Sequence, residues 1–283
     1  MTLTNVDLRG NELTGNIPPE LGTLSNLTSL QMSGNNLSGT LPPELGSLAN
    51  LRTLNLGENN QLGGTLPDTF KNMSQLDKIE IDNTQVTGPI PTWLGSMPTL
   101  RTIRLDDNQH TGSIPPELGN LTNLTTLDIN NNQLTGTIPS SLGNLTKLEV
   151  LFLEQNQLTG CIPPELGNLS NLRELNLSDN QLSCGIPPEL SAVPAQSAGL
   201  TATGVLTSLE QLDLSINQLT GPIPTEFATL TTLTDLDLSY NFLTASDPTL
   251  LAFLNEKDPD WAENQAGGRP VTEQTVYLPL VIR

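Results

Sequence analysis

The stretch LTTLDINNNQLTGTIPSSLGNLTK, residues 124–147, decides the fold, because nearly the whole chain is built from copies of it. With Leu124 counted as offset 0, apolar residues stand at offsets 0, 3, 5, 10, 14, 18 and 21. Asparagine occupies offset 8, glycine offset 12 and proline offset 15. The same frame begins again at leucines that are usually 24 residues apart, namely Leu3, Leu27, Leu51, Leu76, Leu100, Leu124, Leu148, Leu172, Leu209 and Leu233. A leucine-spaced repeat of this length predicts a solenoid of about ten coils.

The pattern within one coil predicts its local structure. Apolar and polar residues alternate from Leu127 to Asn130, as in a short strand with one buried face. Stacked coils place such strands side by side, about 4.8 Å apart, in a parallel sheet. The asparagine at offset 8 is expected to turn inward and pair with backbone groups at the bend. Thr84 interrupts this ladder, so coil 4 is expected to be locally weaker. The proline leads into a short helical turn on the outer side.

The motif LxxLxLxxNxLTGxIPxxLGxLxx resembles the plant-type subclass of the leucine-rich repeat family. Its LTGxIP segment is written here as LTGNIP (13–18), LSGTLP (37–42), LTGTIP (134–139) and LTGPIP (219–224). The resemblance covers residues 3–245. It implies an α/β solenoid, a right-handed superhelix with a concave parallel β-sheet and short 3-10 or helical turns on the convex side. It also implies a second, smaller row of strands at LTGxIP.

The chain is expected to divide into a solenoid over residues 1–245, a cap over 246–262 and a tail over 263–283. The coil that begins at Leu172 is extended within 191–205, and we expect a loop on the convex or lateral side there, with a docking element as the alternative. The cap has helical spacing and a tryptophan that can cover the last coil. Its DPDW stretch resembles the closing segment of bacterial leucine-rich repeat proteins, which favours a bacterial origin.

Composition limits the classes of partner. The net charge is −19 and the isoelectric point is near 4.1, which argues against nucleic acid and against anionic membrane surfaces. The sequence has no apolar run of about 18 residues and no recognisable signal peptide, so no membrane span is predicted. No polar cap precedes the first coil. We therefore expect the chain to be a fragment, or another domain or partner to cover that end.

The two cysteines are expected to form a disulfide. Cys161 and Cys184 are 23 residues apart against a period of 24, so they lie nearly above one another on neighbouring coils. The alternative is two free thiols at turn positions. A disulfide would indicate an oxidising compartment, and we expect a secreted or cell-surface protein.

The sequence offers little for catalysis. The single histidine, His110, occupies an inward-facing core offset, and no Cys/His metal spacing or phosphate-binding glycine loop is present. We therefore expect no enzymatic activity, no catalytic residue, no metal site and no cofactor.

Specificity is expected to lie at the outward offsets of the concave strands. Carboxylates gather there over coils 4–6 with one arginine among them, and Phe152 is expected to point outward as an interface anchor. The predicted ligand-binding residues are Glu80, Asp82, Arg104, Asp106, Asp107, Asp128, Asn130, Phe152 and Glu154. The cluster is interpreted as a site for a basic protein surface, as a site for Ca²⁺, or as a solvated acidic face.

The predicted function is that of a non-enzymatic scaffold that binds a protein ligand through its acidic concave face. The plant-type resemblance implies the same role, since members of that subclass act as receptor ectodomains and as inhibitors of wall-degrading enzymes. The alternative is an extracellular glycan-binding or adhesion module, in which the polar ladder holds a sugar and Phe152 stacks against it.

Overall fold

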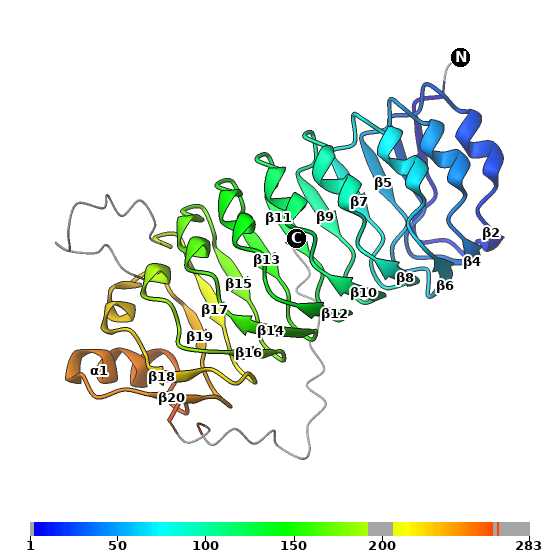
Figure 1. The fold of residues 1–283 in the computed structure, drawn as a ribbon. Coiled ribbons are helices and arrows are strands. Elements are labelled where there is room, and N and C mark those ends of the chain that lie inside the picture. The colour runs from blue at the N-terminus through cyan, green and yellow to red at the C-terminus, as the bar shows by residue number, and fades with distance from the viewer. Residues whose placement is uncertain (1–2, 192–205, 263–264, 266–283) are drawn as a thin grey trace.

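The chain forms a curved solenoid whose coils follow one another along a single arc (Figure 1). The computed structural model describes residues 3–191, 206–262 and 265. The expected insertion at 191–205, apart from Ser191, and the expected tail at 263–283, apart from Gln265, lie outside the described residues.

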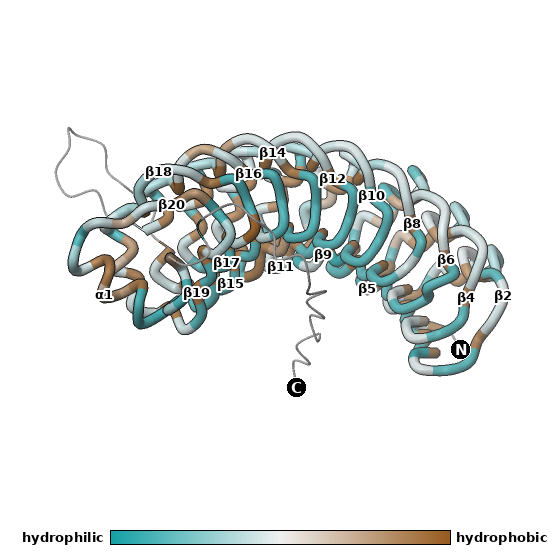
Figure 2. The backbone as a smooth tube through the Cα atoms, turned by 90° about the horizontal axis from the view of Figure 1, so that it is seen from below, coloured by the Kyte–Doolittle hydropathy of each residue, from teal (hydrophilic) through white to brown (hydrophobic). Residues whose placement is uncertain are grey.

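A parallel sheet of ten strands runs along the whole arc, one strand from each coil, in the order of the coils. The central residue of most of these strands is apolar and buried while its neighbours face outward, because successive side chains of a strand point to opposite faces. The strands are β1 (Asn5–Asp7), β3 (Ser29–Gln31), β5 (Thr53–Asn55), β7 (Lys78–Glu80), β9 (Thr102–Arg104), β11 (Thr126–Asp128), β13 (Val150–Phe152), β15 (Glu174–Asn176), β17 (Gln211–Asp213) and β19 (Asp235–Asp237). Figure 2 shows strands of this sheet along the inner side of the arc, so their outward side chains lie on the concave face.

The LTGxIP segments form a second row of parallel strands, as expected. Eight of them make one sheet: β2 (Thr14–Asn16), β4 (Asn36–Thr40), β6 (Gln61–Gly64), β8 (Gln85–Pro89), β10 (Gln109–Ser113), β12 (Gln133–Gly136), β14 (Gln157–Cys161) and β16 (Gln181–Ser183). Strands β18 (Thr220–Pro222) and β20 (Phe242–Thr244) pair separately. The separation falls at the coil that carries the insertion.

Nine short 3-10 helices connect the second row to the next strand of the first among the described residues. They are η1 (Pro19–Thr23), η2 (Pro43–Ser47), η3 (Asp68–Asn72), η4 (Thr92–Ser96), η5 (Pro116–Asn120), η6 (Ser140–Asn144), η7 (Pro164–Asn168), η8 (Pro188–Leu190) and η9 (Thr225–Thr229). A proline with fixed φ precedes each one, such as Pro115 with φ −65°. Neighbouring helices pack so closely that a Cβ at Gly119 would lie 2.3 Å from the Ser141 carbonyl oxygen. A side chain at position 119 would therefore displace the neighbouring turn, although coils 3 and 9 carry Lys71 and Ala228 at the equivalent position.

One α-helix, α1 (Pro248–Lys257), closes the C-terminal end of the arc beside η9 (Figure 1). Asp247 caps its N-terminus by accepting hydrogen bonds from the backbone of Thr249 and Leu250. Trp261 is 5% exposed and joins the core. No helix among the described residues is long and apolar enough to cross a membrane.

The core is one continuous column of leucine and isoleucine side chains, with His110 fully buried among them, as the repeat frame predicts. The asparagine ladder runs beside this core. Asn156 is typical of its rungs: its Nδ2 donates to the carbonyl of Leu153 in its own coil at 3.1 Å and to that of Ile129 in the preceding coil at 3.1 Å. Its Oδ1 accepts from the Leu134 backbone N–H at 3.0 Å.

Two further rungs show how the ladder passes through coils 3 and 4. Asn59, at offset 8 from Leu51, makes the same contacts, with Leu37 N–H donating to its Oδ1 at 3.1 Å. At the interruption, Thr84 Oγ1 donates to Asn108 Oδ1 and accepts from Val86 N–H at 3.3 Å. In a regular rung the corresponding two groups bond directly, as His110 N–H does to Asn132 Oδ1. Here the threonine hydroxyl stands between Val86 N–H and Asn108 Oδ1 and links them.

Cys161 and Cys184 form the expected disulfide, with their Cα atoms 5.3 Å apart. Cys161 ends β14, and Cys184 follows β16 with φ +71°. The Cys184 carbonyl then accepts a hydrogen bond from Thr220 N–H at 2.8 Å. The bridge therefore joins two coils at the place where the second row of strands is divided.

Candidate binding site on the concave face

Two columns of side chains cover the concave face. The first is formed by the last residue of each strand of the ten-stranded sheet, and the second by the residue two positions further on. In the first column Asp128 stands in register between Arg104 and Phe152. In the second, the Asp106, Asn130 and Glu154 carbonyls each accept a backbone hydrogen bond from the preceding coil. The sheet thus fixes the relative positions of the side chains at both offsets.

Three carboxylates, those of Asp106, Asp128 and Glu154, surround Asn130; we call them the carboxylate cluster. Asp106 and Glu154 stand on either side of Asn130 in its own column, and Asp128 stands two residues before it. The Asn130 Nδ2 donates to Glu154 Oε1 at 2.8 Å. Asp106 Oδ1, Asp128 Oδ1 and Glu154 Oε2 are shielded from solvent, yet none of them has a hydrogen-bond partner among the described residues.

Burial dominates the ionisation of this cluster. It raises the pKa of Glu154 to about 8, and the charges of Asp213 and Asp106 add to the effect. The pKa values of Asp106 and Asp128 are also raised, first by burial and then by the charge of an acidic neighbour in each case. These groups therefore hold their protons to higher pH than exposed carboxylates do, so the charge of the face is sensitive to pH and to nearby cations.

Arg104 is the one cation among the predicted ligand-binding residues and the group that would neutralise the carboxylates. Its charge does lower the pKa of Asp82 and Asp128, but burial outweighs this effect for both. Arg104 forms no salt bridge within the part of the chain that the structure describes, and its buried Nε has no hydrogen-bond partner there. The neutralisation is therefore incomplete.

The remaining predicted acidic residues lie outside the cluster. Glu80 Oε2 accepts a hydrogen bond from Asn55 Nδ2 at 2.9 Å. The Asp82 carboxylate lies over Gly57, where an added Cβ would be 2.4 Å from its Oδ1, and burial raises its pKa. Asp107 has φ +52°, is exposed at the turn and accepts a hydrogen bond from Asn131 Nδ2.

The expectation for Phe152 needs a correction. Its side chain does belong to the outward column, in register with Asp128 and Asn176, but it is half-buried and not freely exposed. Curvature brings neighbouring strands' side chains together on this face. Phe152 therefore presents only part of its ring beside the carboxylate cluster.

Sequence reasoning missed Asp213, which continues the acidic line beyond Glu154. Burial raises its pKa to about 6, opposed by the hydrogen bond from Ser215 Oγ at 2.6 Å. Asp237 and Ser239 repeat part of this arrangement in the next coil, where Ser239 N–H donates to Asp237 Oδ1 at 2.9 Å. The signal was the D-L-S tripeptide at the same offset. It also marks the difference from the cluster, whose carboxylates lack such a serine.

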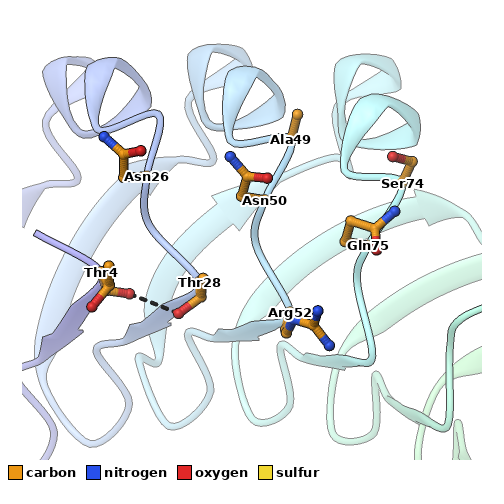
Figure 3. Close-up of a pocket in the computed structure, with 8 residues that line it drawn as sticks. All are labelled: Thr4, Asn26, Thr28, Ala49, Asn50, Arg52, Ser74 and Gln75. Atoms are coloured by element: carbon orange, nitrogen blue, oxygen red, sulfur yellow. Dashed lines mark hydrogen bonds between the residues drawn. The ribbon is translucent and has the colours of Figure 1, made fainter. Parts of the chain in front are cut away.

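A metal site and a polar hollow on the surface are weaker candidates for a functional site. Within the described residues, no group of three or more acidic, histidine or cysteine side chains is arranged to hold a metal ion. A shallow polar hollow lies between the helical turns and the strand starts of coils 1–3 (Figure 3). Arg52 is the charged residue of its lining, and Thr28 Oγ1 closes one side by donating to the Thr4 carbonyl at 2.9 Å. It contains none of the concave carboxylates.

With this geometry in view, comparisons with known proteins identify the class. Models of leucine-rich repeats match residues 2–24, 26–48, 49–109, 208–230 and 232–254, and a model of a leucine-rich repeat region matches residues 91–193. The chain belongs to the leucine-rich repeat family, and its repeats are of the plant type. No curated protein matches the sequence.

Solved structures give relatives for most of the chain. The plant peptide hormone receptor RGFR1, solved in complex with RGF2, is 36% identical with a TM-score of 0.82, over 90% of this chain and 39% of that one. The ectodomain of the Arabidopsis receptor kinase HAESA, solved with an IDA peptide hormone ligand, is 33% identical with a TM-score of 0.72, over 85% of this chain and 42% of that one. A leucine-rich repeat protein of Leptospira interrogans is 30% identical with a TM-score of 0.60, over 90% of this chain and 65% of that one. The chain thus spans less than half the length of these two plant receptors.

Proposed function

We propose that this protein is a non-enzymatic recognition scaffold, secreted or displayed at the cell surface, that binds a basic segment of a protein or peptide ligand across its concave sheet. The observation that carries the proposal is the set of shielded, unpartnered carboxylate oxygens of the carboxylate cluster. Burying charge without a partner is costly, and a cationic ligand would supply the missing partner.

Three further observations support this proposal. The plant receptors RGFR1 and HAESA were each solved with a peptide ligand, so similar scaffolds serve peptide recognition. The Cys161–Cys184 disulfide is typical of proteins outside the reducing cytosol. A net charge of −19 would also attract a basic ligand and speed its encounter.

The test is binding to the immobilised chain as a function of salt. The probes are basic, neutral and acidic peptide pools and a panel of neutral oligosaccharides, each measured at about 0.02 M and about 0.5 M salt. We expect the basic peptides to bind at low salt and to weaken steeply at high salt, because charge steering is screened.

Two outcomes would contradict the proposal. Binding of a neutral oligosaccharide that is unchanged by salt would favour the glycan-binding alternative. If none of the peptide pools bound, the concave face would have no role in recognising basic segments.

A further inference from the structure

Asp128 combines deep burial with an unpartnered carboxylate oxygen. Asp128 is only 8% exposed, yet its Oδ1 makes no hydrogen bond within the described part of the chain. Aspartate at the same offset in a later coil is satisfied internally, since Ser215 donates to Asp213 through both its backbone N–H and its Oγ. Coil 6 has Asn130 in place of that serine. The Asn130 backbone N–H donates to the Asp128 carboxylate, but the Asn130 side chain donates to Glu154, so Asp128 lacks the second donor that Ser215 gives Asp213.

Resting on the proposed function, we infer that the carboxylate cluster around Asn130 holds one lysine or arginine side chain of the ligand. A single ammonium or guanidinium centred near Asn130 would give hydrogen-bond donors to carboxylate oxygens that otherwise have none, and a guanidinium can serve two carboxylates at once. The half-buried ring of Phe152, next to Asp128 in the sheet, offers a surface for the apolar stem or the planar cation.

A cation bound in the cluster should also displace protons from it, because of the groups that surround the cluster. The charged groups that act on it from neighbouring strands and turns are Asp82, Arg104, Asp107 and Asp213. Arg104 is the one cation among these four, and it forms no salt bridge with any described residue. Burial and like charge therefore keep the cluster partly protonated at neutral pH, and a bound cation favours the ionised form.

The alternative occupant is Arg104 itself, which could turn toward Asp128 from the neighbouring strand. In that case the cluster would be an internal charge network and would show no preference for a cationic ligand residue. The two readings differ in what an added peptide does, so binding measurements separate them.

The experiment uses the full chain and pools of 12-residue peptides. Each pool has neutral random flanks and one fixed central residue, which is Arg, Lys, Gln, Glu or Leu. We expect the Arg and Lys pools to be retained and the other pools to be lost. The best Arg peptide is then compared with the same peptide carrying citrulline, which has a similar shape without the charge.

The variants locate the site. Asp128→Asn should weaken the Arg peptide about tenfold or more. The matched control is Asp237→Asn. It removes a concave carboxylate outside the cluster, whose Oδ1 accepts a hydrogen bond from Ser239 N–H. The control should change affinity less than about threefold. The citrulline peptide should bind both variants and the wild type equally weakly.

Calorimetry tests the displaced protons. The observed binding enthalpy should differ between phosphate and Tris buffers at pH 7 because released protons are taken up by the buffer, and affinity should rise by up to about tenfold per pH unit for each proton released. Equal loss in the Asp128→Asn and Asp237→Asn variants, or a buffer-independent enthalpy, would overturn the inference while leaving concave-face binding intact. Failure of every peptide pool would instead overturn the proposed function.

Discussion

Gln265 Nε2 donates to the Leu238 carbonyl oxygen at 2.9 Å, and this contact continues the asparagine ladder beyond the last regular coil. Gln265 follows Asn241 by one 24-residue period, and its Oε1 accepts from Leu243 N–H at 2.8 Å, as the next asparagine would. Asp258 completes the substitution, since its Oδ2 accepts from Leu238 N–H at 3.0 Å, where the next strand would offer a carbonyl. The C-terminal segment is therefore a degenerate coil that closes the backbone of the last strand.

Replacing Gln265 with alanine should destabilise the C-terminal coils. Leu243 N–H and the Leu238 carbonyl would each lose a partner, at a cost of about 1–3 kcal/mol. Urea unfolding of the variant checks this. Gln133→Ala is the control, because Gln133 is exposed on the second row of strands. Equal midpoints for the two variants would show that Gln265 does not close the ladder.

Removing the disulfide by the double substitution Cys161→Ala and Cys184→Ala should lower the free energy of unfolding by about 2–4 kcal/mol. The bridge closes a 23-residue separation between two adjacent coils, at the division of the second row of strands. Thermal melts of wild type with and without reductant give an independent measure. An unchanged melting temperature in both experiments would show that the coils hold together without the bridge.

His110 should make the protein less stable in acid. Burial lowers the pKa of His110 below its ordinary value of 6.5, its Nδ1 contacts the Gly88 carbonyl at 3.1 Å, and its Nε2 has no partner among the described residues. The unfolded chain therefore binds a proton that the folded chain resists, and stability falls as pH drops below about 6.5. His110→Leu should remove this loss and raise stability at pH 5 by about 1 kcal/mol or more. A wild-type fall between pH 7.5 and 5 that persists unchanged in His110→Leu would contradict the assignment.

The carboxylate cluster should act in the opposite direction. Because the pKa of Glu154 is raised to about 8, the folded chain holds a proton that the unfolded chain releases above about pH 4, and stability falls as pH rises toward 8. Glu154→Gln should therefore raise the free energy of unfolding by about 1 kcal/mol or more at pH 8.5 and change it little at pH 4. The control is Glu165→Gln on the exposed helix η7. A gain of equal size at both pH values would exclude ionisation as its cause.

A stabilising substitution that also weakens binding would be informative about function. Binding sites often keep groups whose isolated burial costs stability, because the ligand offsets that cost. A gain in stability together with a loss of affinity at Asp128 and Glu154 would indicate a binding site. In a structural charge network the same substitutions would destabilise the fold.

The sequence predicts the architecture well because a fixed period assigns each residue a place. The burial of His110, the pairing of Cys161 with Cys184 and the inward turn of Asn132 all follow from counting offsets along one coil. Gln265 escaped this reasoning because glutamine replaces asparagine in a segment without the leucine pattern.

The candidate site is less readable from the sequence. Offsets place Asp106, Asp128 and Glu154 on one face, but they do not show how far curvature and neighbouring side chains bury them. For the same reason Phe152 was expected to be more exposed than it is. The separation of Asp107 from the cluster depends on a positive φ at the turn, which the repeat pattern leaves open.

The most direct measurement is the affinity of the selected arginine peptide for two variants that lose the same number of carboxylates. One carries Asp82→Asn, Asp106→Asn and Asp128→Asn on the concave face. The other carries Glu44→Gln, Glu165→Gln and Glu189→Gln, all exposed on the 3-10 helices. We predict that at low salt the concave variant binds at least about a hundredfold more weakly than wild type, while the helix variant loses less than about threefold. Equal losses in the two variants would show that the peptide senses only the overall negative charge and would contradict a binding site on the concave sheet.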